Sequence, residues 1–232
     1  MARSTAASAT VLRIASPTAA DADAGRLVVD EWGRDARLID ALAPFAHLRW
    51  AVSVTGAELV ARTGALIIVN TRRFALTPIA TAWAIGDQLD RPVRFVGRPD
   101  VVPFGPLLRR SGGLLAQPAE IAGALRAGEL VLIGADSTST SGYAGRIDAA
   151  LVGAAISEKV PVHLAAVTSS MTSRNVNVRI SAPLRSNRQR RGPLAEVELA
   201  ETARRRLQEL LDEPVAARLT AQLTPIVTGV RR

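Results

Sequence analysis

The stretch "ALIIVNTRRFALTP", residues 65–78, decides the fold class of this chain. Residues 65–69 form a continuous apolar run, which is typical of a strand buried on both faces of a parallel sheet. The run ends abruptly in Asn70, Thr71, Arg72 and Arg73, and a helical pattern follows. Because open α/β sheets bind ligands beyond the carboxyl ends of their strands, this break predicts a functional site.

Short apolar runs and helical patterns alternate on both sides of this stretch. Helical spacing of apolar residues predicts helices within 36–50, interrupted by Pro44, and within 74–89, 105–111, 118–127, 144–159 and 194–213. Strands are predicted within 48–56, 92–97, 113–117, 129–135, 160–169 and 175–184, and the last alternates strictly, as an edge strand or a strand with one exposed face does. Such interleaving predicts a single α/β domain with a largely parallel or mixed central sheet flanked by helices.

The ends of the chain and its net charge indicate where the protein is located and which partners it favours. Residues 1–25 predict a flexible tail without the apolar core of a signal peptide, and residues 26–232 predict the domain, which ends in an amphipathic helix. No segment offers about 18 uncharged apolar residues, so we expect a cytoplasmic protein that is at most peripheral on the inner face of the cell membrane. The net charge of +8 favours anionic partners. Aromatic residues make up only 3% of the chain, so the sequence does not favour nucleic acid.

Motifs for bound cofactors and metals are absent from the sequence. It contains neither of the glycine-rich loops that bind dinucleotides or nucleotide phosphates, and we expect no cofactor. There is no cysteine, and the two histidines, His47 and His163, lie in a predicted amphipathic helix and a predicted buried strand. Their spacing indicates structural roles and no metal site.

Two polar segments remain as candidates for contact with a ligand or surface. The hydroxyl-rich loop 136–142 follows a buried strand, so Ser137, Thr138 and Ser139 are placed to hold a phosphate, although a plain connector fits equally well. The basic run from Arg185 to Arg191 has the composition of a solvated loop, and contact with an anionic membrane is the alternative.

The order of these blocks resembles the phospholipid and glycerol acyltransferase superfamily, whose members acylate glycerol 3-phosphate and lysophosphatidic acid. "LIIVNTRR" (66–73) takes the place of the family's strand ending in Asn-His-x-x-x-x-Asp. "RFVGRPDVVPFGPLLRRSGGLLAQP", "LRAGELVLIGADSTSTSG" and "AAISEKVPVHLAAV" follow in the order of the family's next three blocks. The resemblance covers residues 29–211, including "VDEWGRDARLID", which is similar to a segment of some actinobacterial-looking members, and it implies an acyltransferase-like fold.

The reactive residues of that family are not matched. Thr71 stands at the position of the family's histidine, the general base, and Leu76 at that of the aspartate that orients it. A threonine hydroxyl is no base near neutral pH, whereas imidazole is. The family's phosphate-binding arginine aligns with Pro118, and the Glu-Gly of its Pro-Glu-Gly motif aligns with Ala135 and Asp136.

Two functions are consistent with this pattern. The first is a degenerate acyltransferase-like protein that binds a lipid, a phosphorylated ligand or a protein partner at the membrane surface, such as an active lipid enzyme or a cell-envelope complex. Its candidate ligand-binding residues are Asn70, Thr71, Arg72, Arg73, Arg109, Arg110, Asp136, Ser137, Thr138 and Ser139. The alternative is an active acyltransferase that moves an acyl group from acyl-CoA or acyl carrier protein to a lysophospholipid or glycerol-type acceptor, with Asp136 or His163 as a substitute base.

Overall fold

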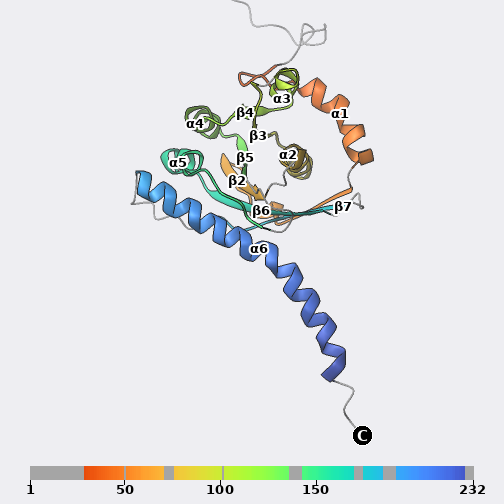
Figure 1. The fold of residues 1–232 in the computed structure, drawn as a ribbon. Coiled ribbons are helices and arrows are strands. Elements are labelled where there is room, and N and C mark those ends of the chain that lie inside the picture. Colours follow the sequence, from red (N-terminus) through yellow and green to blue (C-terminus); the bar gives the residue numbers. More distant parts are fainter. Residues whose placement is uncertain are drawn as a thin grey trace, which may run out of the picture.

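The apolar run at residues 65–70 forms the central strand of a seven-stranded sheet in the computed structural model (Figure 1). The structure describes residues 29–49, 51–70, 76–100, 102–135, 143–169, 175–184 and 192–227. The strands are β1 Ala51–Thr55, β2 Ala65–Asn70, β3 Val93–Gly97, β4 Gly113–Leu115, β5 Leu130–Ala135, β6 Val162–Ser169 and β7 Asn175–Ile180. The helices are α1 Ala36–Arg49, α2 Leu76–Leu89, α3 Gly105–Arg110, α4 Pro118–Arg126, α5 Ala149–Glu158 and α6 Pro193–Val227, with a short 3₁₀ helix η1 at Ala57–Leu59.

The sheet has the strand order β1-β7-β6-β2-β5-β3-β4 and is mixed. Neighbouring strands are parallel except for β6 and β7, which form an antiparallel pair. Every residue of β2 is buried, because strands lie on both sides of it and helices cover both faces. The predicted α/β class and mixed sheet are therefore confirmed.

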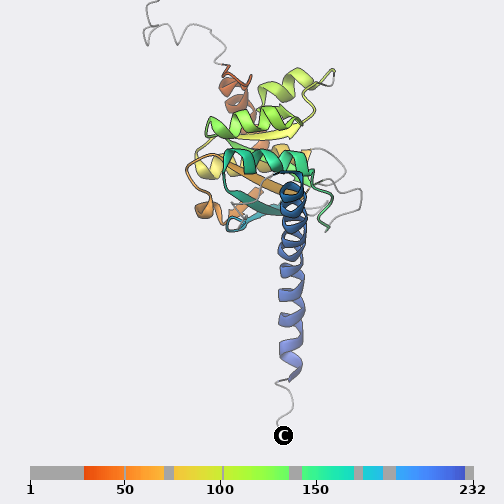
Figure 2. The same ribbon diagram turned by 90° about the vertical axis from the view of Figure 1, so that its left-hand side faces the viewer.

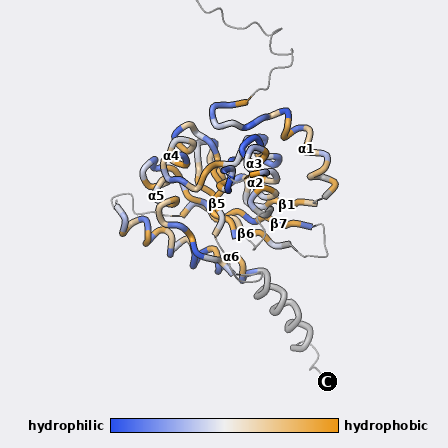
Figure 3. Tube along the Cα trace, turned by 45° about the horizontal axis from the view of Figure 1, so that its top comes forward, coloured by the Kyte–Doolittle hydropathy of each residue, from blue (hydrophilic) through white to orange (hydrophobic). Residues whose placement is uncertain are grey.

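The two faces of the sheet are covered unequally. On one face, α4, α5 and α6 pack over alternate strand residues such as Leu66, Ile68 and Val131 and form the larger core. On the other face, α2 packs over Ile67, Val69 and other residues that point the opposite way. Helix α1 lies beyond α2 on this second side (Figure 1). Hydrophobic residues are concentrated along the central strands (Figure 3).

Local signals explain several element boundaries. Asp148 caps the start of α5, since its side chain accepts a hydrogen bond from the backbone N–H of Ala150 at 2.9 Å. Helix α4 begins with Pro118 at its first position, where a missing N–H costs nothing. Gly112 follows α3 with a φ of +96°, a conformation that glycine adopts easily, and the chain turns there into β4.

Two helices, α1 and α6, differ from the sequence-based prediction. Helix α1 continues through Pro44 instead of being interrupted there. Proline removes one backbone hydrogen bond, to the carbonyl of Asp40, and both residues are exposed, so water can satisfy that carbonyl. Strand β7 has one exposed face as predicted, but it is internal, and β1 forms the edge.

The C-terminal helix is longer than predicted. The prediction ended it at residue 213, whereas α6 continues to Val227 and extends away from the sheet (Figure 2). No helix in the described part of the chain combines the length and the apolar character needed to cross a bilayer. The predicted tail, residues 1–25, and the basic run from Arg185 to Arg191 lie outside the described residues.

Candidate functional site

The corner after β2, where the sequence resemblance places the family's catalytic histidine, begins at Asn70. The side chain of Asn70 is 6% exposed, and its amide NH₂ donates to the carbonyl of Val167 at 2.9 Å. The backbone N–H of Val167 donates back to Asn70 Oδ1 at 2.6 Å. Because the paired register of β2 and β6 ends at Val69 and Ala165, the Asn70 side chain supplies the next rung between these strands. Asn70 therefore holds the strand end together, whatever ligand lies beyond it.

The remaining residues of this corner are placed only by their neighbours along the chain. Thr71, Arg72 and Arg73 lie outside the described residues, and Leu76 is the first residue of α2, with its side chain undescribed. The roles given to these four residues therefore stay predictions.

The strands that precede two of the segments singled out by the sequence end side by side. Asn70, the last residue of β2, is in register with Ala135, the last residue of β5. The side chains of Asp136, Ser137, Thr138 and Ser139 lie outside the described residues, and their contact with a ligand stays a prediction.

Both candidate arginines of α3 have carboxylate partners in the structure. Arg109 forms an ion pair with Glu120 at the start of α4 and donates to the carbonyl of Gly113 at 3.2 Å. Arg110 donates to the carboxylate of Asp35 at 2.6 and 3.2 Å. Both guanidinium groups are thus already paired with a carboxylate. A phosphate would have to displace these carboxylates or bind to the guanidinium groups beside them.

His163, a candidate substitute base, is fully buried in β6. Its Nδ1 lies 3.0 Å from the carbonyl oxygen of Ser181, and its Nε2 has no hydrogen-bond partner. Burial lowers the pKa of His163, and the contact with the Ser181 carbonyl only partly opposes this. His163 pairs with Ile67 in the middle of β2, away from the corner, so the prediction of His163 as a base is wrong. The other histidine, His47, lies on α1, with its side chain undescribed.

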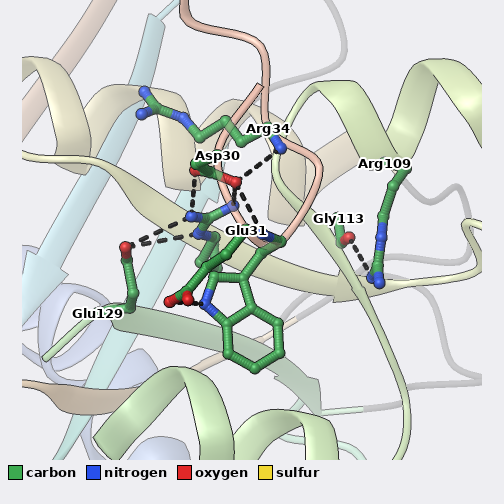
Figure 4. A network of polar contacts seen from close by, with 8 residues as sticks. Asp30, Glu31, Arg34, Arg109, Gly113 and Glu129 are labelled. Atoms are coloured by element: carbon green, nitrogen blue, oxygen red, sulfur yellow. Dashed lines mark hydrogen bonds and ion pairs between the residues drawn. The ribbon is translucent and has the colours of Figure 1, made fainter. Parts of the chain in front are cut away.

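An ionic network that the sequence analysis missed ties the start of the described chain to the sheet (Figure 4). Arg94 of β3 is only 1% exposed and forms ion pairs with Asp30 and with Glu129, the latter at 3.4 Å. Burial raises the pKa of Asp30, but hydrogen bonds from the Arg94 side chain and the Arg34 backbone outweigh it and hold that pKa below its usual value. Trp32 lies in the same segment, against Gly123 of α4. The segment from Asp30 to Asp35 therefore fixes where α1 begins.

A second feature that the sequence analysis missed is an apolar groove between α1 and α2. We call it the α1–α2 groove, and it has a volume of about 620 Å³, within the range of small-molecule sites. Its apolar walls are formed by Ile39, Leu42, Ala43, Phe45 and Ala46 of α1, Ile79, Ala80, Ala82 and Trp83 of α2, and Val93 and Phe95 of β3.

The lining of the groove also includes charged side chains. Asp40, Asp87 and Asp90 contribute carboxylates, and Arg34 and Arg91 contribute guanidinium groups. Helical spacing predicted an apolar face on α1, but only the structure shows that this face stands apart from the core. Within the described ranges, no cluster of three or more His, Asp or Glu side chains is arranged to hold a metal ion.

The fold is shared with a solved acyltransferase. The structure matches the 1-acyl-sn-glycerophosphate (LPA) acyltransferase PlsC from Thermotoga maritima with a TM-score of 0.56 over 78% of this chain and 79% of that one. The sequence identity is 14%, so the likeness concerns the fold. No protein-family model and no curated protein matches the sequence. The chain therefore has an α/β fold of the PlsC acyltransferase type, in line with the block order seen in the sequence.

Proposed function

We propose that this protein uses an acyltransferase-type fold to bind a lipid at the membrane surface and does not carry out the acyl transfer of the related family. The observation that carries the proposal is the open α1–α2 groove. Phe45 is 66% exposed and Leu42 is 42% exposed, although both line this groove. Apolar side chains of that size gain about 1.5–3 kcal/mol each when they are fully buried, so an apolar ligand in the groove is favoured.

The residues at the reactive corner support the loss of chemistry. Thr71 and Leu76 supply neither a base nor a carboxylate to orient one. A general base contributes about 10²- to 10⁴-fold to rate, so without one only the slow turnover that the framework alone allows is left. His163 is buried in the sheet and cannot replace the base. Asp136, which follows β5 in the sequence, is the remaining candidate base, and its substitution tests whether the protein is an enzyme.

The membrane surface is the proposed source of the lipid. Leu48 on α1 is 69% exposed and follows Leu42 and Phe45 at helical spacing, so one face of α1 presents apolar side chains to its surroundings. A helix with such a face can lie in the interface between headgroups and acyl chains. We expect the protein to associate with the membrane peripherally through α1.

Acyl transfer and membrane binding are tested separately. Thiol release from acyl-CoA is measured with lysophosphatidic acid or glycerol 3-phosphate as acceptor, and we expect no release above the rate without protein. Turnover that Asp136→Ala abolishes would establish the alternative, an active acyltransferase with a substituted base.

Membrane binding is measured by flotation with vesicles of phosphatidylglycerol and phosphatidylethanolamine. We expect Phe45→Ser with Leu48→Ser to reduce the floating fraction several-fold, because both side chains are exposed and the changes leave the core intact. Leu194→Ser is the matched control, since Leu194 is 78% exposed but lies at the start of α6. Equal flotation of the wild type and the α1 variant would contradict the membrane role.

A further inference from the structure

Arg34 is one of the residues that line the α1–α2 groove (labelled in Figure 4). Its Nε is buried and has no hydrogen-bond partner among the described residues. Arg94, by contrast, forms ion pairs with Asp30 and Glu129. A buried donor without an acceptor costs free energy, so an anion that reaches it is bound favourably.

The position of Arg34 is fixed by its surroundings. The Cδ of Arg34 lies 3.6 Å from the site where a Cβ on Gly112 would stand, and the Cδ of Arg94 lies 3.9 Å from the same site. Both arginine stems thus lie beside the turn into β4. Burial lowers the pKa of Arg34 and the neighbouring charge of Arg94 lowers it further, while the carboxylates of Asp30, Glu129 and Asp40 oppose this. A guanidinium stays protonated at neutral pH, so Arg34 remains a cation beside the groove.

We propose that the α1–α2 groove binds a long-chain carboxylate, with the acyl chain between α1 and α2 and the carboxylate on Arg34. This inference rests on the proposed lipid-binding function and names its site and ligand class. The lining of the groove is mostly apolar and includes Arg34, whose buried Nε has no partner among the described residues, and this combination complements a fatty acid. A guanidinium binds a carboxylate through two parallel hydrogen bonds, so Arg suits this role better than a point charge.

The other charges of the groove do not supply a competing site. Arg91 donates to the carbonyl oxygens of Ala61 and Gly128 at 3.0 and 3.3 Å and thus has acceptors within the fold. Asp40, Asp87 and Asp90 are exposed to solvent, where water and salt screen their repulsion of an anion.

The orientation separates this site from the reactive corner. Val93 of β3 and Ala65 of β2 are both in register with Leu130, so the Arg34 end of the groove lies near the amino ends of these strands. Asn70 lies at the opposite edge, at the carboxyl end of β2. A carboxylate on Arg34 is therefore remote from the corner where the related family transfers its acyl group, and the ligand is a bound fatty acid rather than an acyl donor.

Equilibrium binding of three twelve-carbon probes to the full chain tests this proposal: dodecanoate, methyl dodecanoate and dodecylamine. We expect dodecanoate to bind most tightly to the wild type. Arg34→Gln removes a hydrogen bond between charged groups, so dodecanoate affinity falls roughly 10- to 100-fold while that of the methyl ester is unchanged. Arg98→Gln is the matched control, because Arg98 is exposed outside the groove, and its affinities equal those of the wild type.

Ala43→Trp fills the groove from α1 and reports where the chain lies. Loss of all three probes in Ala43→Trp, with the thermal unfolding temperature retained, supports the groove as the site. If Ala43→Trp blocks binding but Arg34→Gln does not alter dodecanoate affinity, the carboxylate inference is overturned and lipid binding stands. If no probe binds the wild type and a second copy covers the groove in a dimer that Ala43→Trp dissociates, both proposals fail.

Discussion

Replacing Asn70 by leucine tests whether this family-like residue serves the sheet. The change keeps a side chain of similar size but removes both hydrogen bonds to Val167, one at 2.9 Å and one at 2.6 Å. Val167 is 6% exposed, so its backbone N–H and C=O lose their partners in a place that water reaches poorly. Each buried polar group left unpaired costs about 1–3 kcal/mol, so the free energy of unfolding falls by about 2–6 kcal/mol.

The size of this effect makes it measurable by thermal unfolding. For a chain of this length, 1 kcal/mol corresponds to about 2–4 °C, so the melting temperature of Asn70→Leu falls by roughly 4–24 °C. Asn177→Leu is the matched control, because Asn177 is exposed on β7 and its Oδ1 accepts a solvent-exposed hydrogen bond from the Ser53 hydroxyl at 3.2 Å. That change should stay within about 0.5 kcal/mol. Equal melting temperatures for Asn70→Leu and the wild type would refute the structural role of Asn70.

Asn70→Asp adds a check by pH. In its protonated form the new carboxyl can donate to the Val167 carbonyl and accept from the Val167 N–H, whereas the ionised form cannot donate. Burial raises the pKa of this carboxyl above the value near 3.9 that the unfolded chain has. The variant is therefore most stable below about pH 4, and this stability is lost as the pH rises through the folded-state pKa. A melting temperature that rises between pH 4 and pH 7 relative to the wild type would contradict the assignment.

Two further substitutions test the framework. Gly56→Ala places a Cβ 2.2 Å from the carbonyl oxygen of Ile180 at a φ of +81°. Urea unfolding should show that the free energy of unfolding falls by about 2–6 kcal/mol. Gly128→Ala is the control, because its φ is +86° but no atom lies within 4 Å of the added Cβ, so the strained backbone alone should lower the free energy of unfolding by about 1–2 kcal/mol. Equal losses would contradict the close approach at Gly56. Hydrogen bonds from the Arg110 side chain, then from the backbone, lower the pKa of Asp35, so its stabilising effect is present above the unfolded pKa near 3.9 and is lost as the pH falls through the lower folded value. The melting temperature of Asp35→Asn should thus lie below that of the wild type at pH 7 and approach it in acid, and a gap that persists at pH 2 would argue against the ion pair.

The sheet and its ligand-facing edge could be predicted from the sequence because they depend on local patterns. Continuous apolar runs at β2 and β5 indicated buried parallel strands, and each ended in polar residues. Parallel strands bring such ends to one edge, and the register of Asn70 with Ala135 confirms this adjacency. Pro44 misled the prediction of α1, since an exposed helix tolerates a missing hydrogen bond that a buried one does not.

The buried network and the groove could not be predicted, because they depend on where distant segments meet. Nothing in "PVRFVG" shows that Arg94 points toward Asp30, which lies 64 residues earlier. The apolar face of α1 was visible in the sequence, but a core-facing stripe has the same spacing as a groove wall. Only the distance between α1 and α2 separates these two cases.

The two edges of the sheet suggest how a fold can keep binding while chemistry is lost. At the carboxyl edge, the Asn70 side chain makes two hydrogen bonds with the Val167 backbone, and these stabilise the end of β2 whether or not a catalytic base follows it. At the amino end of β3, the network around Arg94 fixes the segment that carries Arg34 and begins α1. Substitutions at Thr71 and Leu76 change neither of these constraints. The lipid binding that we propose therefore depends on residues other than those at which the family's base and orienting carboxylate stand.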